Sequence, residues 1–231
     1  MKDIEEVKNA WAALAEYYLR AQVSINNYAE YMLAIYGTQV GMSISIEGCM
    51  EKGLDLTWGG AKYNSSGGTA TGLATVADSL STIEYMCFDK KIITTRELYD
   101  AYMANWEGYE ELRQRIIKEV PHYGNSDPYA DRFMIYAVDT YESLCRKMSG
   151  HYYKRFKAGL YGASDHINQG YTAWATPDGR HTGDPIADAT SPSQGRDVCG
   201  PTAVLNSAES FDQSRFMDGL ALNIRIHPTA L

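Results

Sequence analysis

Residues 174–180 have the sequence W-A-T-P-D-G-R. Seven further residues that favour turns follow closely: Gly183, Pro185, Ser191, Pro192, Gly195, Gly200 and Pro201. Pro177 fixes φ, Gly179 permits a positive φ, and the Asp178 carboxylate can bond to the backbone two residues on. This composition predicts a long ordered loop, and such loops in compact domains usually carry function. We expect Asp178 and Arg180 to brace the loop through hydrogen bonds.

A thiol and a carboxylate lie two positions apart in the segment G-C-M-E, at Cys49 and Glu51. A buried carboxylate has a raised pKa and can act as a general base, or it can pair with a substrate hydroxyl group. The alternative is an exposed Glu51 beside Lys52 with no role in chemistry. Both Cys49 and Glu51 are therefore candidate catalytic residues.

Three other arrangements do not support a site. Ser164, Asp165 and His166 are consecutive, so their side chains cannot form the line from serine to carboxylate that proton relay requires. The five histidines have no spacing typical of a metal site, and no metal centre is predicted. The glycine pairs at 59–60 and 67–68 lack the G-K-S/T sequence of a phosphate-binding loop. We expect them to let neighbouring backbones approach closely.

The composition excludes several classes of protein. The net charge is −8 and no run of Lys and Arg occurs, which argues against a nucleic-acid partner. No apolar run approaches the ~20 residues that span a bilayer, and no signal peptide opens the chain. The four cysteines are far apart, without a C-x-x-C pair, as is typical of reduced thiols in the cytoplasm.

A helix is predicted over residues 1–36, because apolar residues recur at alternating spacings of three and four. Asp3 and Glu6 can form a capping box, and Gly37 can end the helix. A packed core helix is favoured over a coiled coil, because tyrosines and the pair Asn26-Asn27 interrupt the pattern. The predicted buried stripe is Ile4, Val7, Trp11, Leu14, Tyr18, Ala21, Ile25, Tyr28, Met32 and Ile35.

The rest of the chain is mainly helical with few strands. Residues 41–68 are predicted to be irregular, and a helix follows from about 69 to 88. Thr94 or Thr95 is predicted to cap another helix, and Glu97 lies in the first turn of that helix. The helical stretch continues to Val120, with a break near Gly108. One more amphipathic helix is predicted over 129–148. Short strands are predicted at 156–161 and, by alternation, at 222–227.

Long helices between isolated strands indicate an α/β fold, and residues 1–231 are predicted to form part of a single α/β barrel domain. The predicted strands are too few to close a barrel. The chain should therefore be incomplete on its own, with an open sheet edge and an exposed apolar face.

Several segments, in this order, resemble one known family. Residues 48–64 are similar to C-x-x-x-G-x-D-x-T-x-G-G-A-x-Y-N, and Asp78-Ser79-Leu80 follows. Residues 122–131 resemble K-Y-G-N-D…A-D, with His122 in place of the usual Lys. The A-T-P-D-G-R segment, the later G-P-T-A-V-L, and then Leu222-Asn223 and Pro228 complete the pattern. The chain is similar to the C-terminal half of the pyruvate formate-lyase family, the glycyl radical enzymes.

This resemblance implies a ten-stranded α/β barrel and an organic radical on a backbone glycine. A separate activating enzyme, with an iron–sulfur cluster and S-adenosylmethionine, installs the radical, which passes to a cysteine that abstracts hydrogen from the substrate. No cofactor is expected on this chain itself. The expected partners are the remainder of the barrel, the glycyl radical domain, the activating enzyme and further copies in a homo-oligomer.

Two features of the family have no counterpart in the sequence. One is the R-V-x-G-Y radical motif, and the other is an upstream thiyl-cysteine loop. The residues after Glu51 match the later G-G-A-x-Y-N segment, so Cys49 is assigned to that segment in preference to the thiyl loop. We therefore expect an internal piece of a longer enzyme. A truncated or split relic without catalysis, acting only as a structural or partner-binding chain, is the alternative.

By the same resemblance, Ala173, Trp174 and Thr176 would face the substrate, and a packed Trp with a turn-forming Thr is the alternative. The loop sequence looks closer to the dehydratase and decarboxylase branches than to pyruvate formate-lyase proper. The expected function is to supply barrel wall and active-site loop to a radical lyase for a small organic substrate. An arylacetate such as 4-hydroxyphenylacetate is one candidate, because Trp174 suits an aromatic neighbour.

Overall fold

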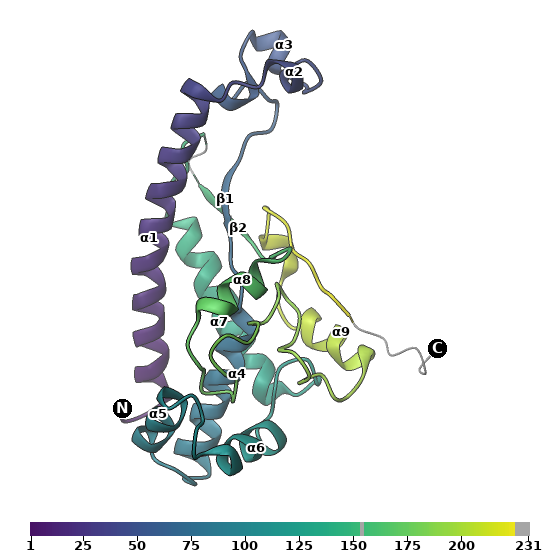
Figure 1. The fold of residues 1–231 in the computed structure, drawn as a ribbon. Coiled ribbons are helices and arrows are strands. Elements are labelled where there is room, and N and C mark those ends of the chain that lie inside the picture. The colour runs from purple at the N-terminus through teal and green to yellow at the C-terminus, as the bar shows by residue number, and fades with distance from the viewer. Residues whose placement is uncertain (153–154, 225–231) are drawn as a thin grey trace.

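The computed structural model describes residues 1–152 and 155–224 (Figure 1). Helices dominate, and the elements surround a short parallel sheet. In chain order they are α1 (Ile4–Tyr36), α2 (Val40–Ser43), α3 (Cys49–Lys52), the 3-10 turn η1 (Leu56–Trp58), β1 (Ser66–Thr69), α4 (Leu73–Ile83), the π-helical turn η2 (Glu84–Asp89), α5 (Thr95–Met103), α6 (Glu110–Glu119), α7 (Pro128–Arg146), β2 (Phe156–Gly159), α8 (Asp165–Thr172), α9 (Pro201–Glu209) and the 3-10 turn η3 (Gln213–Arg215).

The strands β1 and β2 lie side by side and run parallel, with Ser66 opposite Phe156. Glycine is needed in β1, because a Cβ on Gly68 would lie 2.8 Å from the Phe156 ring. A further parallel bridge joins Leu160 to Leu220. The expected close approach of a neighbouring backbone is confirmed at Gly60, where a Cβ would overlap the Leu54 carbonyl, whereas Gly67 and Gly68 make room for side chains. Helices connect successive parallel segments as in the wall of an α/β barrel.

The predicted strand at 156–161 is confirmed in β2 and the bridge at Leu160. The strand predicted at 222–227 is wrong within the described residues. Pairing occurs earlier, at Leu220, and residues 222–224 have no regular structure. Residues 225–227 of that predicted strand, and Pro228, lie outside the described residues.

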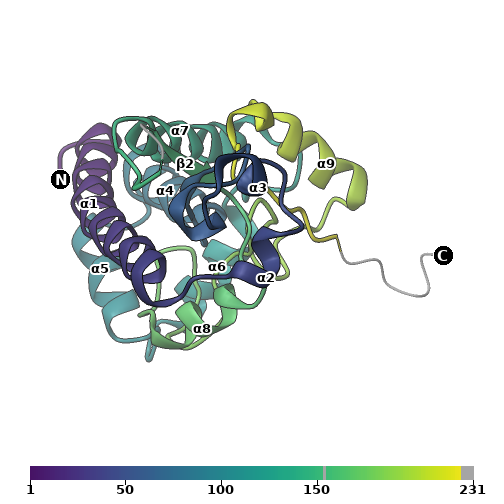
Figure 2. The same cartoon turned by 90° about the horizontal axis from the view of Figure 1, so that it is seen from above.

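The main core forms where α4 and α7 pack against each other and against β2 (Figure 2). The first helix joins it through the rings of Trp11 and Tyr136, whose centroids are 5.8 Å apart. The helices predicted over 1–36 and 129–148 are confirmed as α1 and α7. The predicted cap at Thr94 is also confirmed, since its side chain accepts from the Glu97 amide at 3.2 Å and the Glu97 carboxylate accepts from the Thr94 amide.

A second, smaller core lies between η2, α5 and α6. The predicted break near Gly108 is confirmed, because α5 ends at Met103 and α6 begins at Glu110. Trp106, in the connection, is almost fully buried and is joined by Ala175 of the T-P-D-G-R segment. The loop predicted to carry function is therefore anchored in this core.

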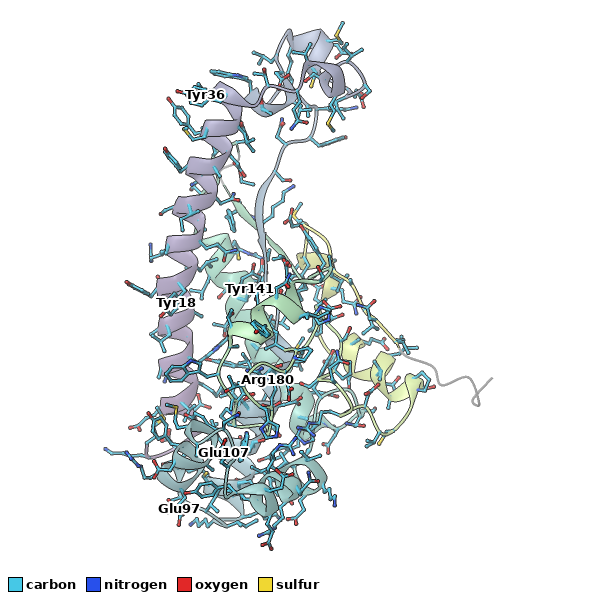
Figure 3. The ribbon with its side chains drawn as sticks, viewed as in Figure 1. Tyr18, Tyr36, Glu97, Glu107, Tyr141 and Arg180 are labelled. Carbon is cyan, nitrogen blue, oxygen red and sulfur yellow. The ribbon has the colours of Figure 1, made fainter. Side chains whose placement is uncertain are left out.

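The buried stripe predicted for α1 is wrong along most of the helix. Leu14, Tyr18, Ile25 and Tyr28 are exposed, and the buried residues are Leu19, Val23 and Ala34 (Figure 3). Ile4, Val7 and Trp11 at the start of the predicted stripe pack against the core, whereas most of the stripe from Leu14 onward faces outward. The expected exposed apolar face is thus present.

Replacement of Met134 tests the main core. The Met134 side chain is fully buried in α7, so Met134→Ala should lower the free energy of unfolding by about 2–5 kcal/mol, through lost burial and a cavity. Met50→Ala, at an exposed site in α3, is the matched control and should change it by less than ~0.5 kcal/mol. Equilibrium denaturation measures both, and equal effects would contradict the assigned core.

Candidate functional site

Two side chains near the smaller core bind the loop that runs from the end of α8 to residue 186. The indole of Trp106 donates to the Arg180 carbonyl at 3.2 Å. Arg113 of α6 donates through Nε to the Gly179 carbonyl at 2.8 Å. Gly179 has φ of 91°, which a side chain would disfavour. These bonds fix the tip of the loop on α6.

Arg180 ties the loop to itself. Its Nε donates to Thr176 Oγ1 at 3.2 Å, its Nη1 donates to the Asp184 carbonyl at 2.6 Å, and its Nη2 donates to the Trp174 carbonyl. The guanidinium group is buried, which lowers the pKa of Arg180, while the carboxylates of Asp178 and Asp184 oppose that shift. Each of the three guanidinium nitrogens holds a different acceptor, a planar arrangement that the single nitrogen of a lysine cannot reproduce.

Asp178 lies at the centre of the loop and is 1% exposed. Its Oδ1 accepts from the Thr176 hydroxyl at 2.5 Å. Burial raises the pKa of Asp178, and the nearby Asp78 carboxylate raises it further, while Thr176, Arg196 and His122 act in the opposite direction. The contacts of Asp178 and Arg180 match the bracing role that the sequence suggested for them.

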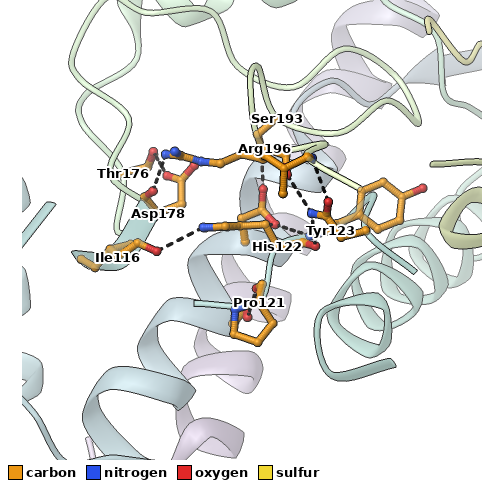
Figure 4. A network of polar contacts seen from close by, with 12 residues as sticks. Ile116, Pro121, His122, Tyr123, Thr176, Asp178, Ser193 and Arg196 are labelled. Atoms are coloured by element: carbon orange, nitrogen blue, oxygen red, sulfur yellow. Dashed lines mark hydrogen bonds and ion pairs between the residues drawn. The ribbon is translucent and has the colours of Figure 1, made fainter. Parts of the chain in front are cut away.

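A second buried carboxylate, Asp78 of α4, joins three separate segments (Figure 4). Its Oδ1 accepts from the Tyr123 amide at 2.8 Å, and its Oδ2 accepts from the Ser193 hydroxyl at 2.6 Å. Its Oδ1 also lies 3.6 Å from Nδ1 of His122. Arg196 then connects this cluster to the loop, since its Nη2 donates to the Asp178 carbonyl at 2.8 Å.

The buried imidazole of His122 stands between the two carboxylates. Its Nε2 lies 3.2 Å from the Ile116 carbonyl, which can only accept, so Nε2 carries hydrogen. Its Nδ1 has no hydrogen-bond partner within the described part of the chain. The ring thus lies against the Asp78 carboxylate, at the position where the segment resembling K-Y-G-N-D usually has Lys.

A small pocket of ≈ 180 Å³ opens beside the loop. Three arginines line it, Arg113, Arg180 and Arg196, together with the carboxylate residues Asp178 and Asp184. Each of the three guanidinium groups already donates to a backbone carbonyl of the loop. The charges therefore serve first to hold the loop in place.

The three residues predicted to face the substrate differ in exposure. Trp174 is 69% exposed at the start of the loop. Ala173 ends α8 and is partly buried. Thr176 is partly buried, and its hydroxyl is engaged by Asp178 and Arg180. Trp174 is thus the side chain most free to contact another molecule, and the role of all three stays a prediction.

Cys49 and Glu51 lie elsewhere. Both belong to the short helix α3, at the far end of the molecule from α8 (Figure 1). The Cys49 thiol is buried, and the exposed Glu51 carboxylate accepts from the Gly48 amide at 2.9 Å. The fold of this chain does not bring them to the loop, and their catalytic roles stay predictions.

Sequence reasoning did not identify the buried network as a site. Asp78 and His122 belong to segments that resemble the family, but nothing in the sequence pattern predicts that they meet each other or Ser193. The available signal was a carboxylate in the apolar run of α4, which must find partners when buried. Across the described residues, no group of three or more His, Cys, Asp and Glu could hold a metal, and no helix is long and apolar enough to cross a membrane.

The network generates a prediction about pH. Because the pKa of Asp178 is raised in the folded chain, its contribution to stability is full below its unfolded value of 3.8 and is lost as pH rises. Because asparagine does not titrate, Asp178→Asn abolishes this loss of stability with rising pH. The stability of the variant relative to the native chain should therefore improve as pH rises from about 4 to 7, measured by urea unfolding.

Asp212→Asn is the control with the opposite sign. Hydrogen bonds from Ser214 lower the pKa of the exposed Asp212, so its contribution is present at neutral pH and is lost as pH falls. The relative stability of this variant should therefore improve as pH falls. Parallel pH profiles for the two variants would contradict the assignment of Asp178.

Arg180→Lys tests the brace. Lysine keeps the charge but cannot reach three acceptors, so backbone amides of residues 174–184 should exchange hydrogen roughly tenfold faster or more, as expected for the loss of charge-assisted bonds. Exchange read by mass spectrometry checks this. Arg20→Lys, on the exposed surface of α1, should leave those amides unchanged.

Comparison with known proteins places these features in a family. Residues 1–170 match the model described as pyruvate formate lyase-like, and residues 186–231 match the model described as glycine radical. Sequence of the glycine radical domain, expected on another part of the enzyme, is therefore present in this chain. The loop described above lies between the two matches.

Individual proteins that are similar to this chain include dehydratases and a decarboxylase subunit. The chain is 38% identical over 198 residues to (2S)-3-sulfopropanediol dehydratase of Klebsiella oxytoca, covering 82% of this chain and 24% of that protein. It is 29% identical to the glycyl radical subunit of 4-hydroxyphenylacetate decarboxylase of Clostridium scatologenes, covering 98% and 28%. The glycerol-bound B12-independent glycerol dehydratase of Clostridium butyricum superposes with a TM-score of 0.92 at 33% identity, covering 100% and 29%.

The chain thus spans between 24% and 29% of the length of these relatives, and its helices and parallel strands are a portion of their barrel. The expected fold and the dehydratase branch are confirmed. On the sequence match and the shared fold, the chain belongs to the pyruvate formate-lyase-like glycyl radical enzymes.

Proposed function

We propose that this chain supplies barrel wall and an active-site loop to a glycyl radical lyase that dehydrates or decarboxylates a small organic substrate. The observation that carries the proposal is the loop at 173–185. Buried ionic groups hold it rigid, while Trp174 at its start stays exposed. A site of this kind needs side chains whose supports are fixed, because misplacement by an ångström is costly to catalysis.

When present in the whole enzyme, the glycyl radical supplies a cysteine thiyl that removes hydrogen from the substrate. An activating enzyme with an iron–sulfur cluster and S-adenosylmethionine would install it. The residues of this chain would bind and orient the substrate and exclude water. Ala173, Trp174 and Thr176 are the proposed contacts, and the rest of the barrel is the proposed partner, within a homo-oligomer.

A hydroxylated substrate is the first candidate for the proposed reaction. The sulfopropanediol and glycerol dehydratases are among the relatives, and their named substrates carry hydroxyl groups. An arylacetate such as 4-hydroxyphenylacetate is the second candidate, supported by the exposed indole of Trp174 and by the decarboxylase relative. A chain that only binds a partner, without catalysis, is the alternative.

The test begins with the coding sequence on both sides of this reading frame. The longest polypeptide it encodes would be expressed without oxygen with its activating enzyme, and the radical would be sought by electron paramagnetic resonance. A glycyl radical signal with turnover of a diol or an arylacetate supports the proposal. Neither signal nor turnover, despite an encoded R-V-x-G-Y motif, would overturn it in favour of the non-catalytic alternative.

In that enzyme, Trp174→Ala should lower kcat/KM roughly fivefold or more, as expected when an aromatic contact worth about 1 kcal/mol is lost. Trp58→Ala is the matched control, because Trp58 is also exposed but lies in η1, near α3. An unchanged kcat/KM in Trp174→Ala, or the same loss in both variants, would remove Trp174 from the site.

A further inference from the structure

The carboxyl ends of three parallel segments meet at one edge of the sheet. Thr71 follows β1, Gly162 follows β2, and Asn223 follows the bridge at Leu220. Ligands of parallel sheets bind outside the carboxyl ends of the strands, because loops there converge while helices cover the faces. This edge is therefore where a binding site is expected on physical grounds.

A pocket of ≈ 540 Å³ lies at this edge. His166, in the first turn of α8, lines it together with Asp188, and Asn223 contributes from the third segment. Among the described residues that line it, the carboxylates are Asp188 and Asp197, and none is Lys or Arg. The pocket therefore suits a neutral or cationic molecule better than an anion.

His166 and Asp188 form a pair within the wall of this pocket. Nδ1 of His166 lies 3.5 Å from Oδ1 of Asp188, and both side chains are largely buried. Oδ2 of Asp188 accepts from the side-chain amide Nδ2 of Asn223 at 2.5 Å. Neither Nδ1 of His166 nor Oδ1 of Asp188 has a hydrogen-bond partner among residues 1–152 and 155–224, and both atoms are hidden from solvent.

This geometry selects one form of the imidazole. A carboxylate oxygen can only accept, so Nδ1 must carry hydrogen to face Asp188 favourably. In the neutral ring, Nε2 then has a free lone pair. Because Nδ1 is turned into the wall, the side of the ring that lines the pocket is the side with Nε2.

The backbone around His166 and Asp188 is tied together by a hydrogen bond and is strained at two positions. The Ile186 amide donates to the His166 carbonyl at 3.2 Å, which ties the segment before Asp188 to α8. Ala163 and Ala189, close to the two partners, have φ of 44° and 52°, a left-handed conformation that is unfavourable for a residue with a side chain. Such strain in two places around one pocket is typical of a site that must keep its geometry.

We propose that His166 and Asp188 form an acid–base pair that binds a hydroxyl group of a small uncharged molecule. The hydroxyl donates to Nε2 of His166, while Asp188 fixes the tautomer from behind. None of the proposed substrate contacts Ala173, Trp174 and Thr176 lines this pocket, so failure of this proposal would leave the proposed function standing.

The test uses the full chain labelled with nitrogen-15 and long-range proton–nitrogen spectra of its imidazoles. Glycerol, as the simplest triol, and acetate, as a small anion, are the probes. His166 should show hydrogen on Nδ1, and glycerol should shift its Nε2 signal saturably, whereas acetate should not. Asp188→Asn should weaken glycerol binding roughly fivefold, while Asp165→Asn, an exposed neighbour on α8, should not.

A His166 ring with hydrogen on Nε2, or an Nε2 signal that does not respond to glycerol, would overturn the proposal. So would an equal response to acetate, since the pocket would then not discriminate by charge. The measurements on the native chain need no variant, so they decide the matter even if Asp188→Asn fails to fold.

Discussion

The burial of two carboxylates is the constraint on which the rest of the structure depends. Asp78 and Asp178 are almost fully removed from water, and neither can remain so without donors or positive charge around it. The donors come from the segment at 122–123, from Ser193 and from Thr176. Helix α4, the connection before α7 and the long loop must therefore be assembled together, and the loop is rigid because an unpaired charge would be the alternative.

Much of the local structure could be predicted from the sequence. The long first helix, the cap at Thr94 and the helix around Tyr141 depend on interactions within a few residues, which periodicity and capping preferences report directly. The bracing pair Asp178 and Arg180 could also be anticipated, because both partners lie in one turn-rich segment. Local patterns thus identified the loop before its surroundings were known.

The rest could not be predicted, because it depends on contacts between distant segments. Asp78 and Ser193 are 115 positions apart, and His166 meets Asp188 only because α8 folds back onto the following loop. The buried stripe predicted for α1 is wrong along most of the helix for a related reason. Periodicity shows that a stripe exists, but a neighbour decides whether it is covered, and within this chain α4 and α7 contact the adjacent face.

The pairing of β1 with β2 also has a consequence for how the chain folds. Ser66 meets Phe156 across about 90 residues, and the regular elements described between the two strands are helices and helical turns. Helices α4 to α7 can form early from local contacts, whereas the sheet must wait until its two segments have been brought together. Until then the glycine-rich β1 presents unpaired amides and carbonyls. Within this chain, the β1 edge that binds β2 is paired only after residues 156–159 have been synthesised, and until then that edge can promote aggregation or chaperone capture.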